Sequence, residues 1–363
     1  MTVLRTRADE VRALSELRAQ VHAAGLDRQT PLLSLSILAM HVVLMFGGLV
    51  VFVVAEPLWL RLVALALSTY GALGVGMTGH NASHYAVTGH KTADRAVTYF
   101  TMALCHGISA CYWRVKHIRL HHVAPNNSAF DTDHDLLPFF ALSQEDVDKA
   151  TGWQRRLHRV QHLVFPFAVS LNMLNLKIWG IRWIVSELKG PRRWRPTIWV
   201  DIACIATHFT ALVIVPAFFW PLWQVIGFFL LREALHGYIM FAAAAPPHFP
   251  AEAKFVKADP HGPGVLAGQI FTTVNYRTGL FGRLSCLGAE YQIEHHLVPE
   301  INPLRSPQVS EIVQKFCARY DYPYRSFGWW EGIVKAVQAV AHPKPIERIE
   351  DLIGAPRTAA TSS

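Results

Sequence analysis

The sequence predicts an all-α integral membrane protein with four transmembrane helices in two hairpins, interfacial helices and a histidine-rich cytoplasmic cap. Of the 363 residues, 52% are hydrophobic and only 17% are charged, a balance too apolar for an ordinary soluble domain and too charged for membrane spans alone. The apolar residues gather in two pairs of long runs, and each pair is joined by a very short turn. The chain also holds 19 histidines, and histidine is the commonest metal ligand.

The first hairpin follows a polar N-terminal segment. Residues 1–30 are rich in arginine and have a helical rhythm, so we expect a cytoplasmic amphipathic segment there. It is not a secretory signal, because the apolar run comes late and lacks a small-residue cleavage site. Spans are predicted at about 31–55 and 57–79, each long enough for the ~20 residues that cross a bilayer. The turn at Glu56 and Pro57 makes these two spans a hairpin.

The segment from about 80 to 197 is rich in histidine, lysine and arginine. Its two weaker apolar runs, at 97–113 and 163–181, are interrupted by polar residues, which indicates interfacial or re-entrant helices. The second hairpin is predicted from spans at 198–220 and 221–245, which again meet in a minimal turn.

A single membrane domain is therefore predicted over residues 31–345, with a disordered tail at 346–363. The two short turns carry no lysine or arginine, and the net charge is +8. The positive-inside rule then places both termini and the histidine-rich segments in the cytoplasm. This net positive charge favours contact with anionic lipid or with an acidic partner. Nucleic acid is not expected, because no basic stripe with interleaved aromatic residues is present.

The histidines cluster in three boxes, each beginning near a predicted cytoplasmic end of a span. The first, "GHNASHYA", holds His80 and His84, whose spacing of four places both rings on one face of a helix. The second, "WRVKHIRLHHVAPNN", repeats this spacing with His117 and His121. His122 lies about 100° further round an α-helix, where it could reach a second metal.

The third box, "EYQIEHHLVPEIN", supplies Gln292, His295 and His296. Imidazoles can also cap helices or satisfy buried polar groups, but seven of them in three boxes are poorly explained in that way. Neutral imidazole nitrogens suit iron, zinc or copper. Seven or eight such ligands exceed the coordination number of one ion, so a dinuclear centre is predicted.

The order HxxxH, HxxxHH and QxxHH, between and after two predicted hairpins, resembles the membrane fatty acid desaturase family over residues from about 30 to 325. "QIEHHLVP" is most similar to the front-end desaturase subgroup. "TTVN" (Thr272–Asn275) and "HHVAPNNSAFDTDHD" (His121–Asp135) also resemble the family. The second box departs from the front-end pattern, which usually has two residues where this chain has three. No cytochrome b5 domain with an HPGG haem motif is present, which implies a separate electron donor.

The resemblance implies a di-iron enzyme, with two Fe ions and O2 as co-substrate. It would introduce a double bond into a long acyl chain, carried as a fatty acyl lipid, acyl-CoA or carrier-bound acyl group. It also implies a bacterial-type inner or plasma membrane, a cytoplasmic active site and a donor such as ferredoxin or cytochrome b5 with a reductase. The same site could serve a hydroxylase, ketolase or acetylenase acting on a lipid or natural-product intermediate. A histidine-rich metal transporter is less favoured, since it should place its ligands at the bilayer midplane.

The family adds one ligand after the last span, and two histidines are candidates. His248, in "APPHFPAEA", is favoured because prolines end the helix there and its distance to "TTVN" fits the family. His236, beside Arg232 and Glu233 inside the fourth predicted span, is the alternative, since an ionisable residue within a membrane is a functional candidate.

Further residues are predicted to surround the metals. Gln292 is a possible ligand. Other polar side chains would orient the imidazoles by accepting Nδ1–H bonds, and this set comprises Asp131, Asp133, Asn275 and Glu294. Three basic residues beside the second box would bind a phosphate-bearing headgroup or an acidic electron donor, with contact to anionic lipid as the alternative. They are Arg114, Lys116 and Arg119.

Overall fold

Four long apolar helices are the main feature of the fold. The computed structural model describes residues 4, 6–133, 135–191 and 193–354. Among these residues, four helices are long and apolar enough to cross a membrane. They are α2 (Pro31–Val54), α3 (Leu58–Ser83), the helix Pro196–Phe218 and α10 (Leu222–Ala244). The predicted all-α class with four spans is confirmed, and the largest shift of a boundary is at the end of α3, which reaches Ser83.

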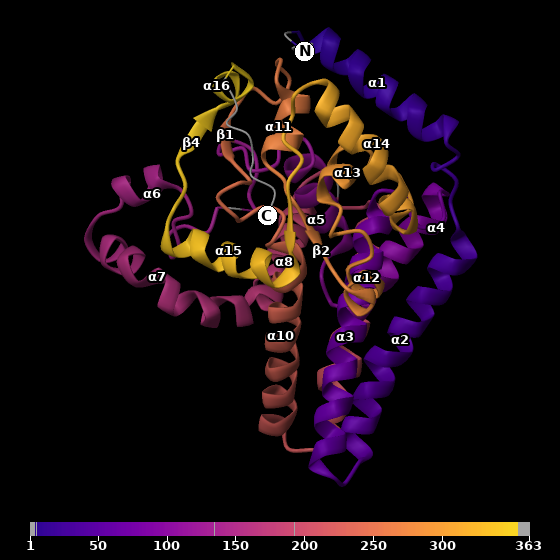
Figure 1. The fold of residues 1–363 in the computed structure, drawn as a ribbon. Coiled ribbons are helices and arrows are strands. Elements are labelled where there is room, and N and C mark those ends of the chain that lie inside the picture. Colours follow the sequence, from indigo (N-terminus) through magenta and orange to yellow (C-terminus); the bar gives the residue numbers. More distant parts are fainter. Residues whose placement is uncertain (1–3, 5, 134, 192, 355–363) are drawn as a thin grey trace.

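The first two spans lie side by side (Figure 1) and pack closely because small residues face the neighbouring backbone. A Cβ atom on Gly48 would lie 2.6 Å from the carbonyl oxygen of Ala64. The hydroxyl of Ser68 donates to the carbonyl oxygen of Met45 at 2.7 Å. The second half of α3 is buried without interruption from residue 71 to 83, so its C-terminal end lies inside the protein.

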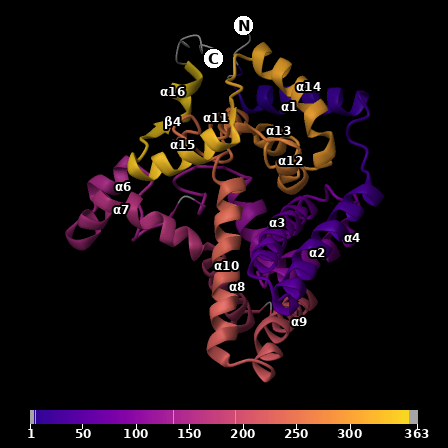
Figure 2. The same cartoon turned by 60° about the horizontal axis from the view of Figure 1, so that its bottom comes forward.

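The third span is not a continuous α-helix. It consists of α9 (Pro196–Phe209), the π-helical turn η3 (Thr210–Ile214) and the 3-10 turn η4 (Pro216–Phe218). Figure 2 shows α9 at the same end of the molecule as the start of α10.

The two weaker apolar runs do not form straight spanning helices. The first is divided among α4 (Lys91–Thr98), the π-helix η1 (Tyr99–Cys105) and α5 (Ala110–Arg114). The second falls on α7 (Gly152–Ser170) and α8 (Asn172–Lys189), which meet at an angle of 68°. This bend is the geometry of a broken span or a re-entrant loop.

Above the spans in Figure 1, shorter elements surround a separate core. The amphipathic N-terminal helix α1 (Arg7–Ala23) packs on α14 (Ser306–Arg319) and α11 (Val265–Phe271). Leu17 and Val313 are fully buried in this core. The remaining helices are η2 (Val115–His121), α6 (Gln144–Lys149), α12 (Leu280–Cys286), α13 (Gln292–Leu297), η5 (Pro303–Arg305), α15 (Trp329–Ala341) and α16 (Ile349–Gly354).

Two short parallel strand pairs connect distant parts of the chain. β1 (Phe255–Lys257) pairs with β4 (Ile346–Arg348), and β2 (Asn275–Arg277) pairs with β3 (Ser326–Gly328). Both pairs join the segment that follows α10 to the C-terminal region.

The disordered tail predicted at 346–363 starts too early. Residues 346–354 form β4 and α16, because the polar segment carries apolar residues that anchor it. Ile349 and Leu352 are buried in the same core as Leu17. Residues 355–363 lie outside the described residues.

Candidate metal centre

The eight histidines predicted as ligands meet in two adjacent groups. The five-histidine group consists of His80, His84, His117, His122 and His295, and the three-histidine group of His121, His248 and His296. Within each group the candidate ligand nitrogens all lie within 4.8 Å of one another. The sequence neighbours His121 and His122 are divided between the groups, as are His295 and His296. Two metal sites side by side can therefore share the second and third boxes.

The second box pairs its histidines differently from the α-helical expectation. His117 and His121 were expected on one face, but residues 115–121 form the π-helix η2. Hydrogen bonds in a π-helix join residues five apart, and the amide of His122 donates to the carbonyl oxygen of His117 at 2.9 Å. His117 consequently shares a face with His122, their Nε2 atoms 3.1 Å apart, and His121 belongs to the other group.

The spacing of nitrogens in the five-histidine group fits metal binding. The Nε2 atoms of His84 and His117 are 3.0 Å apart, and those of His122 and His295 are also 3.0 Å apart. Bonds of about 2.1 Å at right angles place two nitrogen ligands of one ion about 3.0 Å apart. The indole of Trp113 stacks on His117 with ring centroids 4.7 Å apart, which holds that imidazole in place.

Burial sets the protonation of these side chains. Removal from water disfavours the imidazolium form, and neighbouring imidazoles add repulsion. Both effects, burial first, lower the pKa well below the ordinary histidine value for six of the eight. These are His84, His117, His122, His248, His295 and His296. They are therefore neutral at pH 7, which is the form of imidazole that binds a metal.

Asp131 fixes the orientation of His121. Its Oδ2 atom lies 2.9 Å from His121 Nδ1 and also accepts the amide N–H of Asn126 at 2.8 Å. Asp133 approaches the same imidazole nitrogen at 3.4 Å and forms an ion pair with Lys116. A carboxylate on Nδ1 leaves Nε2 free for a metal and makes it a stronger ligand.

The other two members of the three-histidine group are held in the same way. His296 Nδ1 lies 2.8 Å from Oε1 of Gln269, and His248 Nδ1 lies 3.4 Å from the carbonyl oxygen of Thr272. Both oxygens accept an N–H, so both imidazoles direct Nε2 towards the group. The set of donors and their partners thus fits a bound metal at this point.

Gln292 lies at the edge of the three-histidine group. Its amide nitrogen is 3.0 Å from His248 Nε2 and 3.2 Å from His296 Nε2. The amide oxygen and nitrogen of glutamine have nearly the same shape, so a turn of the amide would offer the oxygen as a further ligand. The role of Gln292 as a possible ligand stays a prediction.

Asn275 and Glu294 do not orient imidazoles, contrary to expectation. Glu294 accepts the amide of Asn275 at 2.8 Å and the hydroxyl of Tyr324 at 2.6 Å. The side-chain oxygen of Asn275 accepts the amide N–H of Ile293 at 2.9 Å. The two residues therefore fix α13, the helix that carries the third box, and act on the histidines only through its backbone.

His236 joins neither histidine group. It is buried in the middle of α10, with its ring centroid 5.6 Å from that of His106. The neighbouring Glu233 is occupied by Arg232 at 2.6 Å and by Lys177. Of the two candidates for the extra ligand, only His248 lies with the box histidines.

The basic residues beside the second box are mostly engaged within the protein. Arg114 donates to the carbonyl oxygen of Ser83 and to the hydroxyl of Tyr85, each at 3.0 Å. Lys116 pairs with Asp133. Of the three predicted docking residues, Arg119 is the one whose side chain is exposed.

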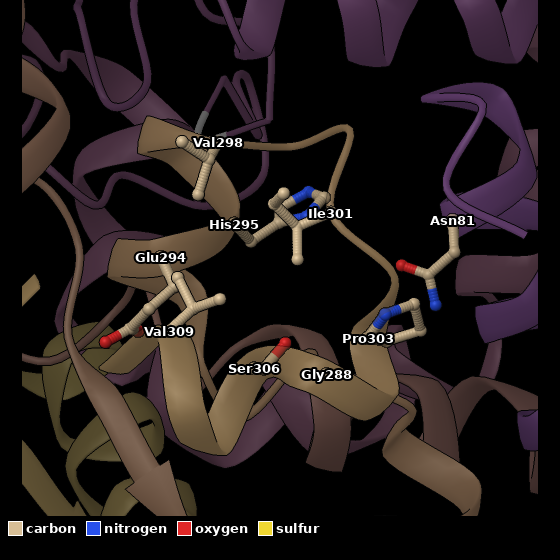
Figure 3. A pocket seen from close by; sticks show the side chains of 9 residues that line it. All are labelled: Asn81, Gly288, Glu294, His295, Val298, Ile301, Pro303, Ser306 and Val309. Carbon is tan, nitrogen blue, oxygen red and sulfur yellow. The ribbon is translucent and has the colours of Figure 1, made fainter. Parts of the chain in front are cut away.

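A small pocket borders the five-histidine group beside His295 (Figure 3). Asn81, at the end of α3, and Ser306, at the start of α14, line its walls. His295, one of the candidate ligands, therefore lines a small pocket together with residues from α3 and α14.

Sequence reasoning did not single out three residues that support the three-histidine group: Asn126, Gln269 and Lys344. Gln269 lies just before the quoted stretch "TTVN", and Asn126 lies within the quoted acidic stretch. Their contacts join residues far apart in the chain; the amide of Asn126, for example, donates to the carbonyl oxygen of His248 at 2.9 Å. No local pattern signals such a contact.

Fold and site together define a membrane protein with two histidine groups, buried or partly buried, that are suited to metal ions. A family model described as fatty acid desaturase matches residues 57–328. The chain belongs to the fatty acid desaturase family. This membership agrees with a lipid substrate, with membrane association and with an iron site.

Named relatives give the same family. The chain is 25% identical over 299 residues to Delta(8)-fatty-acid desaturase 2 of Arabidopsis thaliana, covering 78% of this chain and 64% of that protein. It is 29% identical over 275 residues to Delta(8)-fatty-acid desaturase of Euglena gracilis, covering 74% and 64%. It is 27% identical over 265 residues to Delta(5) fatty acid desaturase fat-4 of Caenorhabditis elegans, covering 71% and 58%. The matches span less than two thirds of these relatives.

Proposed function

We propose that this protein is an O2-dependent membrane desaturase that introduces a double bond into a long acyl chain. The observation that carries the proposal is the meeting of three histidine boxes and His248 in two adjacent groups. Family membership supports the reaction class, and the names of the relatives support an acyl chain as substrate.

Two iron ions would occupy the site, one in the five-histidine group and one in the three-histidine group with Gln292. When bound, the iron pair supplies the O2 chemistry that breaks an unactivated C–H bond, for which no side chain suffices. Desaturation removes one hydrogen from each of two neighbouring carbons. O2 takes these two hydrogens together with two electrons and two protons and leaves as two molecules of water.

The protein's own residues would orient the metal ligands and exclude water from the site. Asp131, Gln269 and the carbonyl of Thr272 hold the imidazoles of one group in the orientation that directs Nε2 inwards. Burial would keep bulk water from the reacting carbons, and the protein around the two groups would hold one C–C bond beside the metals. His80 lies in the last turn of the membrane-spanning helix α3, where an acyl chain that leaves the bilayer core would arrive.

The remaining parts of the proposal concern partners and orientation. The positive-inside rule favours cytoplasmic termini and a cytoplasmic active site. We place the protein in a bacterial-type inner or plasma membrane, although the relatives named above are eukaryotic. Electrons would come from a separate donor such as ferredoxin or cytochrome b5 with its reductase. Arg119, which is exposed and lies two residues before His121, would contact an acidic donor.

Lipid profiling of cells tests the proposal. Cells that express the protein should contain an acyl product lighter by two hydrogens, and cells that express His296→Ala should not. His162→Ala, which removes an exposed histidine of α7, is the matched control and should keep the product. A product heavier by one oxygen atom would instead establish a hydroxylase, and an undiminished product from His296→Ala would contradict the ligand assignment.

A further inference from the structure

A buried lysine from the C-terminal region donates hydrogen bonds to the loop that carries His248. The side chain of Lys344 is almost fully buried, and the residue lies beyond the segment matched by the family model. Its ammonium donates to three backbone carbonyl oxygens, those of His248 at 3.3 Å, Pro250 at 3.1 Å and Ala253 at 2.5 Å. The nitrogen also lies 3.8 Å from the ring centroid of Phe255.

These contacts satisfy the whole hydrogen-bonding capacity of the lysine. An ammonium has three N–H donors and no acceptor, and the three carbonyls match that number. A buried charge is costly unless it is hydrogen-bonded, and the aromatic face adds cation–π stabilisation. The ammonium of Lys344 is therefore held in one position by the carbonyl oxygens of the loop.

The backbone hydrogen bonds of the loop itself form short turns, in which the amides of His248 and Phe249 donate to the carbonyl oxygen of Ala245 at 3.1 and 3.0 Å. Pro246, Pro247 and Pro250 lie within a few residues of His248, and proline has no N–H for a backbone ladder. The carbonyl oxygen of His248 accepts a second donor, the side-chain amide of Asn126 at 2.9 Å. Lys344 and Asn126 thus fix the backbone of His248 from two different parts of the chain.

The lysine is itself anchored on both sides. Its amide donates to the carbonyl oxygen of Leu142 at 2.9 Å, and its carbonyl accepts the amide of Gln144 at 2.8 Å. Two residues later β4 begins and pairs with β1, with Ile346 opposite Phe255. These contacts anchor the main chain around Lys344, and so fix the position from which its ammonium reaches the loop.

We propose that Lys344 is a positioning residue that holds His248 in the three-histidine group, so that the C-terminal segment completes this metal site. The inference rests on metal binding at that group, as proposed above. Loss of the lysine frees the His248 carbonyl on one side, and the imidazole then spends less time within reach of a metal. The five-histidine group contains no residue of this loop and keeps its metal.

Metal titration of the purified full-length protein in detergent tests this role. Iron per chain and the affinity for each equivalent, measured by chelator competition, are compared among wild type, Lys344→Met and His248→Ala. We expect both variants to retain one tightly bound iron, and Lys344→Met to bind the second ~10- to 100-fold more weakly, the usual effect of losing an outer support of a ligand. Lys335→Met is the matched control, because Lys335 contacts the same loop through Glu252 at 2.6 Å near the surface. It should match wild type.

The outcomes separate the two proposals. If wild type binds no iron, the proposed function fails before any variant is considered. If wild type binds two and Lys344→Met binds both with wild-type affinity, or loses both in parallel with its thermal stability, the positioning role is wrong. Should Lys344→Met not accumulate, Lys344→Gln, which keeps donors on a shorter side chain, is measured against the same expectation of a selective loss and the same contrary results.

Discussion

Replacement of Asp131 by asparagine tests whether this carboxylate orients His121 for metal binding in the three-histidine group. The carboxylate of Asp131 accepts N–H groups from His121 Nδ1 at 2.9 Å, from the backbone of Asn126 at 2.8 Å and from the backbone of Asp133 at 2.9 Å. Both oxygens are engaged, and the side chain is fully buried. Asparagine keeps one oxygen but turns the other into an NH2 group that faces an N–H.

The size of the effect follows from that mismatch. A buried donor left without an acceptor costs ~1–3 kcal/mol, so the free energy of unfolding should fall by about this amount. Imidazoles that lose a partner on Nδ1 bind metal ~10- to 100-fold more weakly. We expect Asp131→Asn to weaken the iron bound by the three-histidine group in this range and to leave the other iron unchanged.

Chelator competition and chemical denaturation of the purified protein measure the two quantities. Asp135→Asn is the control, because Asp135 is exposed and its side chain accepts only a backbone N–H of Leu137 at 3.3 Å among the contacts of the described residues. An Asp131→Asn variant with the metal affinity of wild type would refute the orienting role of this carboxylate.

Three further tests, with five substitutions in all, have clear expectations. His248→Ala should remove about one iron per chain while His236→Ala keeps both, as metal analysis would show; the reverse order would make His236 the ligand. Gly48→Ala should lower the thermal midpoint, since its Cβ would lie 2.6 Å from a backbone oxygen, whereas Gly47→Ala meets nothing within 4 Å and should not; equal midpoints would contradict the close packing of α2 on α3. Arg119→Glu should slow reduction by an acidic donor protein without loss of iron, and unchanged reduction kinetics would place the donor elsewhere.

The spans could be predicted from sequence because their signal is local. A run of ~20 apolar residues must be buried in lipid wherever the rest of the chain lies, and the bounds of α2 and α10 agree with expectation within a residue or so. The tail was misjudged for the opposite reason. Ile349 and Leu352 stand among charged residues and are stabilised only by a core built from distant helices.

The sequence could predict which histidines form the site, but not how they are grouped or which residues support them. Box spacing identifies which histidines are candidates, and His248 follows from its place after the last span. The supporting residues escape this reasoning, since Gln269 reaches His296 across 27 positions and Lys344 reaches His248 across 96. Contacts of that range depend on the packing of the whole cap, which no spacing rule contains.

The π-helix η2 explains why the second box has its particular order. On an α-helix, His117 and His121 would face one site and His122 would stand apart. In the π-helix, hydrogen bonds join residues five apart, so His117 and His122 lie on one face and belong to the five-histidine group. His121 lies with His248 and His296. A π-helical turn is energetically unfavourable and tends to occur at functional sites. Here it changes how the second box is divided: an α-helix would separate His122 from the other two histidines, whereas η2 separates His121 from them.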